Sequence, residues 1–263
     1  MAKKFYVVWQ GRTPGIYTDW NSCKAQVEKF AGAKYKAFPT QAEAQQAFAG
    51  GAASSSIRST SKSSSTVKKK PAVNGIKTYT AAEIDAMPLD VKIFTDGGCE
   101  PNPGQAGSGM AIYRSENGKA HISELWYGLY NPMGTNNTAE LNALYQALKM
   151  AKIESEQGKS VAIFCDSKYS IQCVTQWAIG WEKKGWKKAG GEIKNLDVIK
   201  PMFALHQTLK NKIHVLHVNG HVGVEGNELA DRMSILAIES KETQFVCYQQ
   251  KIDVAYLLSL RAG

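Results

Sequence analysis

The sequence has few of the features that mark membrane-inserted or disulfide-bonded proteins. No apolar run approaches the ~18 residues that a membrane-spanning helix needs. The N-terminus, MAKKFYVVWQGR, has an apolar patch of only five residues, which is too short for a signal peptide. The five cysteines are odd in number and include no CxxC pair, which indicates reduced thiols and argues against a zinc site. We therefore expect a soluble, cytoplasmic protein with no membrane partner, or a nuclear one in a eukaryote.

Acidic residues are absent from one segment, residues 51–77. That segment carries six Lys or Arg among eight Ser, and it has almost no large apolar side chains. It cannot bury enough surface to offset the entropy lost on ordering, so we expect a flexible basic linker. The run Lys68-Lys69-Lys70 has the pattern of a solvated charge cluster, although it could also touch phosphate groups.

The excess positive charge lies almost entirely before residue 78. The net charge is +9 for the whole chain, but it is +4 over residues 1–50, +6 over residues 51–77 and −2 over residues 78–240. A basic N-terminal part joined to a near-neutral remainder suggests an arm that binds a polyanion and serves a separate working domain. The alternative is that this charge only keeps the chain soluble.

The pattern of apolar residues after the linker predicts an α/β domain. GSGMAIYR and HISELWYGLY are strands separated by the turn SENGKA, as in an antiparallel hairpin, and VKIFTD is a third strand before them. Helices and strands alternate from there on, which predicts a mixed five-stranded sheet flanked by helices. The strands are expected at residues 91–96, 107–114, 121–130, 161–166 and 212–218, and the helices at residues 138–158, 167–179, 193–211 and 228–240.

Two of the predicted core strands, VKIFTD and VAIFCD, end on a carboxylate. The alternation of side chains along a strand places Asp96 on the face of Phe94, and Asp166 on the face of Phe164. Asp-Gly is also a common turn, so TDGG alone leaves that reading open. The alternative is that Asp96 belongs to a cluster of metal-binding acids. That interpretation requires further acids at positions where packing favours an apolar side chain.

Two of the predicted helices have such acids. Glu140 lies four residues before Leu144, and Asp231 lies four residues before Ile235, so each belongs to the apolar stripe of its helix. Any one of these acids could be a cap or turn residue. Uncompensated, the cluster would cost about several kcal/mol in repulsion and desolvation, so the pattern favours a divalent cation bound by Asp96, Glu140, Asp166 and Asp231.

The chain resembles a known family at these segments. TDGGCEPNPG, TNNTAELNAL, CDSKYSIQ, WAIGWEKKGWKKAGGEIKNLD and HVGVEGNELAD are similar, in order and spacing, to motifs of type 1 ribonuclease H. Residues 3–49 look like the small RNA–DNA hybrid-binding domain of that family. The expected organisation is a small α+β hybrid-binding domain at 1–50, the linker at 51–77, a ribonuclease H-like catalytic domain at 78–240, and a C-terminal extension of unknown role at 241–263. The run VAYLLSL in this extension should pack on the core, and the alternative is that it binds a partner.

The resemblance implies an endonuclease that hydrolyses the RNA strand of RNA–DNA hybrids by a two-metal-ion mechanism, leaving 5′-phosphate and 3′-hydroxyl ends. The four acids would bind two Mg²⁺ ions, with Mn²⁺ as the alternative. His221 matches the family histidine that assists proton transfer or product release. We expect a monomeric catalytic domain, with any self-association through the N-terminal domain.

The resemblance also implies which residues contact the nucleic acid. Short amides can read 2′-hydroxyls in a minor groove, and interleaved tryptophan and lysine are typical of a nucleic-acid-binding surface. The helical spacing of Trp177 and Trp181 also fits core packing, so we expect both to be partly buried. The implied catalytic-domain contacts are Asn102, Thr135, Asn136, Asn137, Tyr169, Trp177, Trp181, Lys184, Lys187 and Asn195, with Thr135 and Asn195 in a phosphate pocket.

The N-terminal domain supplies a second set of implied contacts, which are Tyr6, Trp20, Tyr35 and Lys36. Trp20 could instead fill the core of that small domain. The chain departs from the family at two positions. Met133 stands where relatives carry an arginine near the phosphate pocket, and Ala37 stands where the family has a second lysine. Both changes predict weaker nucleic-acid binding.

Two other classes share part of this pattern. A transposase or integrase would share the fold and the acids, but the basic tryptophan segment and HVGVEGNELAD argue against it. A non-catalytic hybrid-binding protein would not need the complete set of four acids. Cleavage of labelled RNA in a hybrid, with and without Mg²⁺, would separate the three classes.

Overall fold

The structure is a computed structural model that describes residues 5–28, 30, 33–38, 40–49, 76–188, 190–220 and 223–263. It divides into two compact units, Met1–Pro71 and Ala72–Gly263, which we call the N-terminal unit and the main unit. Each unit is described by itself. All of the predicted linker except Ile76 and Lys77 lies outside the described residues.

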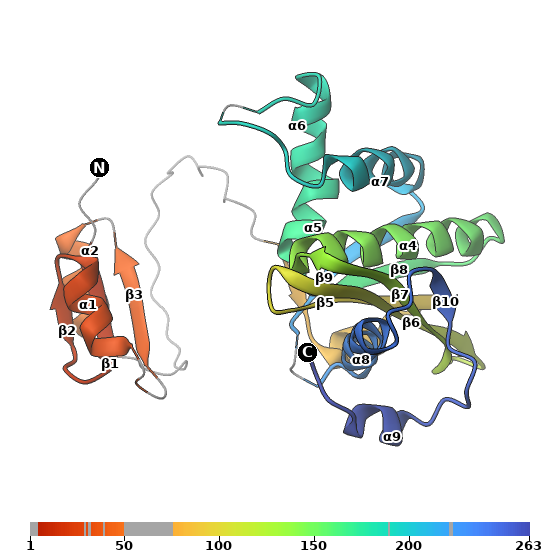
Figure 1. The fold of residues 1–263 in the computed structure, drawn as a ribbon, viewed down its shortest axis with the longest axis horizontal. Helices are drawn as coiled ribbons and strands as arrows, with labels where there is room; N and C mark the ends of the chain where they lie inside the picture. The colour runs from red at the N-terminus through yellow and green to blue at the C-terminus, as the bar shows by residue number, and fades with distance from the viewer. Residues whose placement is uncertain are drawn as a thin grey trace, which may run out of the picture. The chain divides into compact units, whose positions relative to one another are not determined.

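The N-terminal unit is a three-stranded antiparallel sheet with two helices (Figure 1). Val8, Cys23 and Val27 form its small core. Asp19 caps the first helix by accepting a hydrogen bond from the Ser22 amide at 2.8 Å. The elements are β1 (Phe5–Gln10), β2 (Gly15–Tyr17), α1 (Trp20–Val27), β3 (Lys34–Phe38) and α2 (Gln41–Ala49), and the strand order is β2-β1-β3.

The main unit is built on a mixed sheet of seven strands among the described residues, in the order β10-β7-β6-β5-β8-β9-β4. The pairs β5–β8, β8–β9 and β9–β4 are parallel, and the other three are antiparallel. The strands are β4 (Thr78–Tyr79), β5 (Val91–Glu100), β6 (Gly104–Glu116), β7 (Lys119–Gly134), β8 (Val161–Cys165), β9 (Ile213–Val218) and β10 (Phe245–Cys247).

Helices cover both faces of this sheet (Figure 1). The helices α4 and α7 pack on one face, where Ile93 is buried, and α8 packs on the other, where Phe94 is buried. The α/β fold, with its mixed sheet flanked by helices, is therefore confirmed. The helices are α3 (Ala81–Asp85), α4 (Asn136–Glu156), α5 (Lys168–Gln172), the π-helical turn η1 (Cys173–Trp177), α6 (Ala178–Lys183), α7 (Leu196–Leu209), α8 (Glu225–Ser240) and α9 (Val254–Ser259).

Close approach of α4 to β5 requires glycine at one position. A Cβ atom on Gly97 would lie 2.3 Å from the backbone nitrogen of Glu140, so only glycine fits there. Gly109 on β6 has the same role against α8, since its Cβ would lie 2.0 Å from the carbonyl oxygen of Ala230. These contacts bring both helices down onto the sheet beside the end of β5.

Among the described residues, the sheet of the main unit has two more strands than the five predicted. Both β4 and β10 are edge strands of two or three residues, too short to give an alternating pattern in the sequence. The predicted helix at 167–179 is divided by the π-helical turn, and the one at 193–211 begins only at Leu196. Asn195 precedes it in a left-handed conformation with φ of 58°.

Residues 241–263 pack on the main unit, as expected. Strand β10 pairs with β7, and the ring of Phe245 stacks on Trp126 with centroids 6.0 Å apart. Leu257 of α9 is buried beside α8. In the described part of the chain, no helix is both long and apolar enough to cross a membrane.

Candidate active site and nucleic-acid-binding surface

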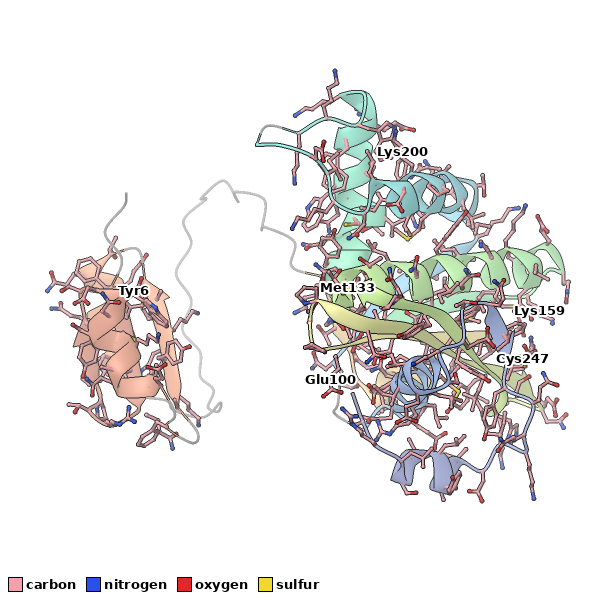
Figure 2. All side chains as sticks on the ribbon, viewed as in Figure 1. Tyr6, Glu100, Met133, Lys159, Lys200 and Cys247 are labelled. Atoms are coloured by element: carbon pink, nitrogen blue, oxygen red, sulfur yellow. The ribbon has the colours of Figure 1, made fainter. Side chains whose placement is uncertain are left out.

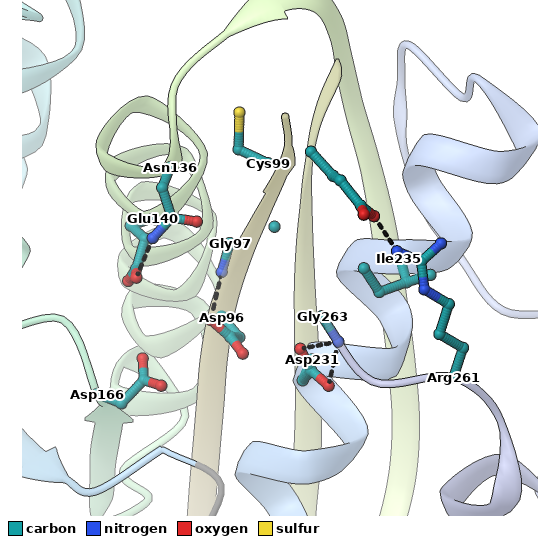
Figure 3. Close-up of a pocket in the computed structure, with 12 residues that line it drawn as sticks. Asp96, Gly97, Cys99, Asn136, Glu140, Asp166, Asp231, Ile235, Arg261 and Gly263 are labelled. Carbon is teal, nitrogen blue, oxygen red and sulfur yellow. Dashed lines mark hydrogen bonds and ion pairs between the residues drawn. The ribbon is translucent and has the colours of Figure 1, made fainter. Parts of the chain in front are cut away.

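The structure brings the four predicted acids together in one pocket of about 420 Å³. Figure 3 shows Asp96 between the Glu140 and Asp166 side chains on one side and Asp231 on the other. Asp96 lies on β5, Glu140 on the first turns of α4, Asp166 directly after β8, and Asp231 on α8. The carboxylates therefore come from four elements and meet where the strands β5 and β8 end.

Hydrogen bonds hold these carboxylates in place. The Gly97 amide donates to Asp96 Oδ1 at 2.7 Å, and Asn136 Nδ2 donates to Glu140 Oε1 at 3.2 Å. Asn227 of α8 donates to Asp166 Oδ2 at 3.3 Å. Glu140 Oε2 is buried and has no hydrogen-bond partner among the described residues. A buried carboxylate oxygen without a hydrogen-bond partner is stabilised by binding a cation or a proton.

The pocket is electrostatically unfavourable without a cation. Burial raises the pKa of Asp96 well above its ordinary value, and the charges of Asp166, Glu140 and Asp231 raise it further. Burial and the charge of Asp166 also raise the pKa of Glu140 well above its ordinary value. These carboxylates are crowded and resist ionisation. A divalent cation bound between them would neutralise their negative charge.

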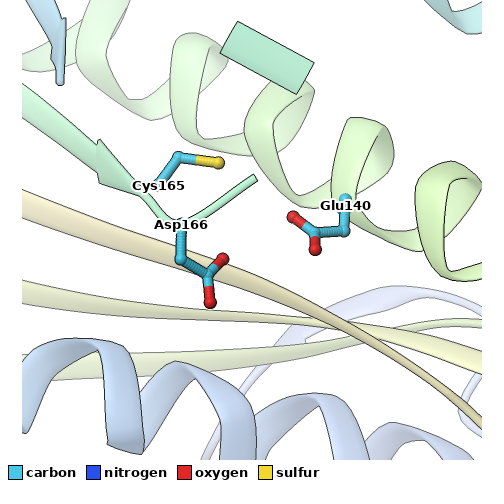
Figure 4. A group of neighbouring side chains, drawn as sticks. All are labelled: Glu140, Cys165 and Asp166. Atoms are coloured by element: carbon cyan, nitrogen blue, oxygen red, sulfur yellow. The ribbon is translucent and has the colours of Figure 1, made fainter. Parts of the chain in front are cut away.

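The donor set fits a hard cation. Glu140, Cys165 and Asp166 offer ligand atoms within 4.8 Å of one another (Figure 4). Burial raises the pKa of the Cys165 thiol well above its usual value, so this group stays protonated and is a poor metal ligand. Cys165 is fully buried at the end of β8. Oxygen ligands then dominate, as Mg²⁺ or Mn²⁺ prefers.

A second pocket, of about 400 Å³, lies beside the first. Asn136 lines the acid pocket, and its backbone N–H donates to Asn102 Oδ1 at 3.3 Å. Asn102 lines the second pocket, so this hydrogen bond connects the two. Of the predicted nucleic-acid contacts, the second pocket contains Asn102, Thr135, Asn137, Tyr169, Trp177, Trp181 and Asn195.

Thr135 and Asn195 are fixed by local structure. Thr135 caps α4, and its neighbour Thr138 donates from Oγ1 to Asn195 Oδ1 at 2.9 Å. This bond ties the start of α4 to the start of α7. Lys188 and Lys194 also line the pocket, although we did not single them out within the basic segment.

The tryptophans of the basic segment are partly buried, as predicted. Trp177 lies between the rings of Tyr169 and Trp181, with centroid distances of 5.9 Å to each. Trp181 packs against the core, while Trp177 remains 37% exposed. Lys184 and Lys187 are exposed but do not line the pocket. Met133 is 76% exposed and supplies no charge near Thr135 (Figure 2).

The predicted contacts of the N-terminal unit gather on its surface. The Trp20 ring lies 5.5 Å from that of Tyr6 and 5.9 Å from that of Tyr35. Trp20 is 42% exposed and is not part of the small core, which disfavours the purely structural reading. Lys36 is exposed on β3, but its Nζ lies 5.7 Å from the ring centroid of Phe38, on the opposite face of the strand from Tyr35, so it lies outside the aromatic cluster.

His221 lies outside the described residues, so its predicted role stays a prediction. The acid pocket also contains residues that the sequence did not indicate, and two of them come from the C-terminal segment. Arg261 and Gly263 line it, although they follow Asp231 by about thirty residues. Nothing in their local sequence marks them as site residues.

The sheet, the helices on both faces and the four carboxylates at the strand ends define a nuclease-like α/β protein with a candidate metal site. Residues 88–239 match the family RNase H, and residues 4–48 match the Ribonuclease H1 N-terminal domain. The chain belongs to the ribonuclease H family, and its enzyme class is ribonuclease H, as predicted.

Relatives and solved structures agree with this assignment. Ribonuclease H1 of Homo sapiens is 31% identical over 260 residues, which cover 88% of this chain and 87% of the relative. Ribonuclease H of Pseudomonas putida is 36% identical over 160 residues, covering 60% of this chain and 99% of the relative. The foamy viral protease-reverse transcriptase in complex with RNA/DNA hybrid has a TM-score of 0.51 at 20% identity, over 66% of this chain and 22% of that chain, which is a likeness of fold.

Proposed function

We propose that the chain hydrolyses the RNA strand of RNA–DNA hybrids at the acid pocket, using two divalent metal ions and leaving 5′-phosphate and 3′-hydroxyl ends. The observation that carries this proposal is the convergence of four carboxylates from four elements in a pocket next to a basic, aromatic surface. Family membership supports the same reaction.

Asp96, Glu140, Asp166 and Asp231 would bind the ions, with Mg²⁺ as the first choice and Mn²⁺ as the second. Bound there, the ions would activate a water molecule and stabilise the charge on the leaving 3′ oxygen. The protein holds the ligands rigidly through Gly97, Asn136 and Asn227, so little reorganisation is needed when the substrate arrives. His221 would assist proton transfer or product release.

The two adjoining pockets suggest how the hybrid is recognised. The RNA strand would pass over the acids, where Asn102 and Asn136 can donate to and accept from 2′-hydroxyls. The DNA strand would lie against the second pocket, with a phosphate between Thr135 and Asn195 and with Trp177 and the lysines beside it. The surface cluster of Tyr6, Trp20 and Tyr35 would bind the same hybrid elsewhere along its length.

The test is cleavage of a hybrid whose RNA strand is labelled. With Mg²⁺ the protein should cut the RNA internally, and it should spare RNA duplex and DNA duplex. Phosphatase treatment should be needed before a kinase can label the new 5′ ends. Asp96→Asn should lower kcat at least about a hundredfold, since metal ligands support several kcal/mol of transition-state stabilisation.

Glu116→Gln is the matched control, because it neutralises an exposed acid at the end of β6. It should cleave as the unchanged protein does. Cleavage that persists in EDTA, or full activity of Asp96→Asn, would contradict the proposal.

A further inference from the structure

We call residues Leu260–Gly263 the strap, because this segment places Arg261 and Gly263 in the acid pocket (Figure 3). The strap follows helix α9, which is anchored by the buried side chain of Leu257. Arg261 and Gly263 line the same pocket as the four carboxylates. The strap therefore occupies part of the surface from which a phosphate group would approach Asp231.

The strap is bound to site residues at both ends. The Gly263 amide donates to Asp231 Oδ1 at 3.1 Å and to Oδ2 at 3.2 Å. The Arg261 guanidinium forms an ion pair with Glu100, which stands beyond Asp96 on β5 and also lines the pocket. The strap therefore contacts Asp231, a predicted metal ligand, and Glu100, the last residue of β5.

A third residue fastens the strap to α8. Arg232 Nε donates to the carbonyl oxygen of Leu260 at 3.1 Å, and Nη2 donates to that of Leu258 at 3.4 Å. The same guanidinium forms an ion pair with Asp231. The strap, Arg232 and Asp231 are thus parts of one hydrogen-bonded group.

Close contact makes the strap and a substrate compete for space. A Cβ atom on Gly263 would lie 2.7 Å from Asp231 Oδ1 and 3.2 Å from Ile235 Cδ1, so the backbone lies directly against the carboxylate. The amide hydrogen bonds also engage both oxygens of Asp231. A nucleic-acid backbone that reached this carboxylate would have to displace Arg261–Gly263.

We propose that the strap is an autoinhibitory segment, which covers the acid pocket in the free protein and is displaced by the RNA strand of the substrate. This inference rests on the proposed function, because it concerns access to the same site. The strap presents a backbone amide to Asp231 and an arginine to Glu100 at the rim of the pocket. In this way it satisfies part of the negative charge of the pocket until a hybrid and its metal ions replace it.

The strap is held weakly enough to be displaced. All four of its residues are exposed, and the Arg261 and Glu100 side chains are 59% and 62% exposed, so solvent screens their ion pair. The apolar anchor lies upstream, at Leu257, which is 1% exposed. The strap can therefore leave the pocket while α9 stays in place.

The same contacts could instead serve to position Asp231 for catalysis. The two roles have opposite kinetic signatures. If the strap competes with the substrate, removing it lowers KM and leaves kcat unchanged, because saturating hybrid displaces it anyway. If it positions Asp231, removing it lowers kcat.

The experiment compares the full chain with a deletion of residues 261–263 and with Arg261→Ala, by initial rates on a labelled hybrid in Mg²⁺. We expect kcat/KM to rise about three- to tenfold for the deletion, through KM alone, as for a site that is open only part of the time. Arg261→Ala should give a smaller rise in the same direction. Lys251→Ala is the control, since it removes one exposed positive charge outside the strap and should change nothing.

A second measurement follows the strap without catalysis. In EDTA, hydrogen–deuterium exchange of residues 260–263 in the full chain should speed up when the hybrid is added. In Arg261→Ala this exchange should be fast before the hybrid is added. Unchanged KM for the deletion, a fall in kcat, or exchange that slows on hybrid binding would overturn the proposal. Failure of every variant to cleave would instead count against the proposed function.

Discussion

The carboxyl groups of Asp96 and Glu140 are buried and largely excluded from water. Their exposed fractions are 6% and 7%, and burial and neighbouring acids raise the pKa of both. Protein folding alone gains nothing from this arrangement, because each ionised carboxylate loses hydration and repels the others. The arrangement is favourable only with a cation bound, so stability and metal binding should be linked.

In the metal-free protein, we predict that stability depends on the ionisation of Asp96. A carboxyl whose folded pKa is raised above its unfolded value binds protons more tightly when folded. It therefore lowers stability as pH rises from about 4 towards the folded pKa. In EDTA at neutral pH, Asp96→Asn should raise Tm by roughly 2–4 °C for each 1 kcal/mol relieved. The measurement is thermal unfolding against pH for both proteins.

Two results of that measurement are diagnostic. The difference in Tm between Asp96→Asn and the unchanged protein should shrink as pH falls through about 4, because Asp96 is protonated in both states only below its unfolded pKa. Mg²⁺ should raise the Tm of the unchanged protein more than that of Asp96→Asn, since binding to the folded state stabilises it. An Asp96→Asn variant that is less stable in EDTA at neutral pH would show that the carboxylate has a structural role.

At the scale of elements, the short strand β4 is connected to the acid pocket through β9. Thr78 Oγ1 lies 2.7 Å from His217 Nδ1, and His217 Nε2 lies 3.1 Å from the carbonyl oxygen of Asp166. Burial lowers the pKa of His217, which favours the neutral ring. Because the carbonyl can only accept, Nε2 carries the proton and Nδ1 accepts from the Thr78 hydroxyl.

We therefore predict that Thr78→Val is destabilising, because it leaves a buried ring nitrogen without a donor. The cost should be about 1–3 kcal/mol in the free energy of unfolding, measured by urea denaturation of the full chain. Thr78→Ser keeps the hydroxyl and serves as the control. Equal stability of the Val and Ser variants would mean that the hydrogen bond contributes nothing. Shortened chains should accordingly retain Thr78.

At the scale of the whole molecule, charge and chemistry are divided between the two units. The acids of the pocket all belong to the main unit, whereas residues 1–77 carry a net charge of +10. The N-terminal unit adds the surface aromatics Tyr6, Trp20 and Tyr35. A tethered basic unit increases the effective concentration of hybrid at the catalytic pocket.

We predict that a chain beginning at residue 78 still cuts hybrids at saturating substrate but binds long hybrids more weakly. The salt dependence of Kd should become shallower, since fewer phosphate contacts release counterions. Trp20→Ala should reproduce part of the loss without a change in net charge, through lost stacking of about 1–3 kcal/mol. Kd is measured for a long hybrid at several salt concentrations.

Phe48→Ala is the control for Trp20→Ala, because Phe48 is similarly exposed, at 39%, on another element of the same unit. It should bind as the unchanged protein does. Equal Kd and equal salt dependence for the full chain and the shortened chain would show that the basic arm does not hold the hybrid.

The sequence by itself determined the main elements and the faces on which the acids lie. The period of two along VKIFTD and VAIFCD fixes the faces of Asp96 and Asp166, and the helical period does the same for Glu140 and Asp231. These periods are local properties of the backbone, so a single sequence reveals them. Strands of two or three residues, such as β4 and β10, have no such period and were missed.

Only the tertiary structure decided which distant segments meet. The hydrogen bonds from Gly263 to Asp231, from Asn227 to Asp166, and from His217 to the Asp166 carbonyl join residues far apart in the chain. Their partners depend on how helices and edge strands pack, and packing depends on the shape of the whole core rather than on any local pattern. For this reason the acids could be predicted from the sequence, whereas the strap that contacts Asp231 could not.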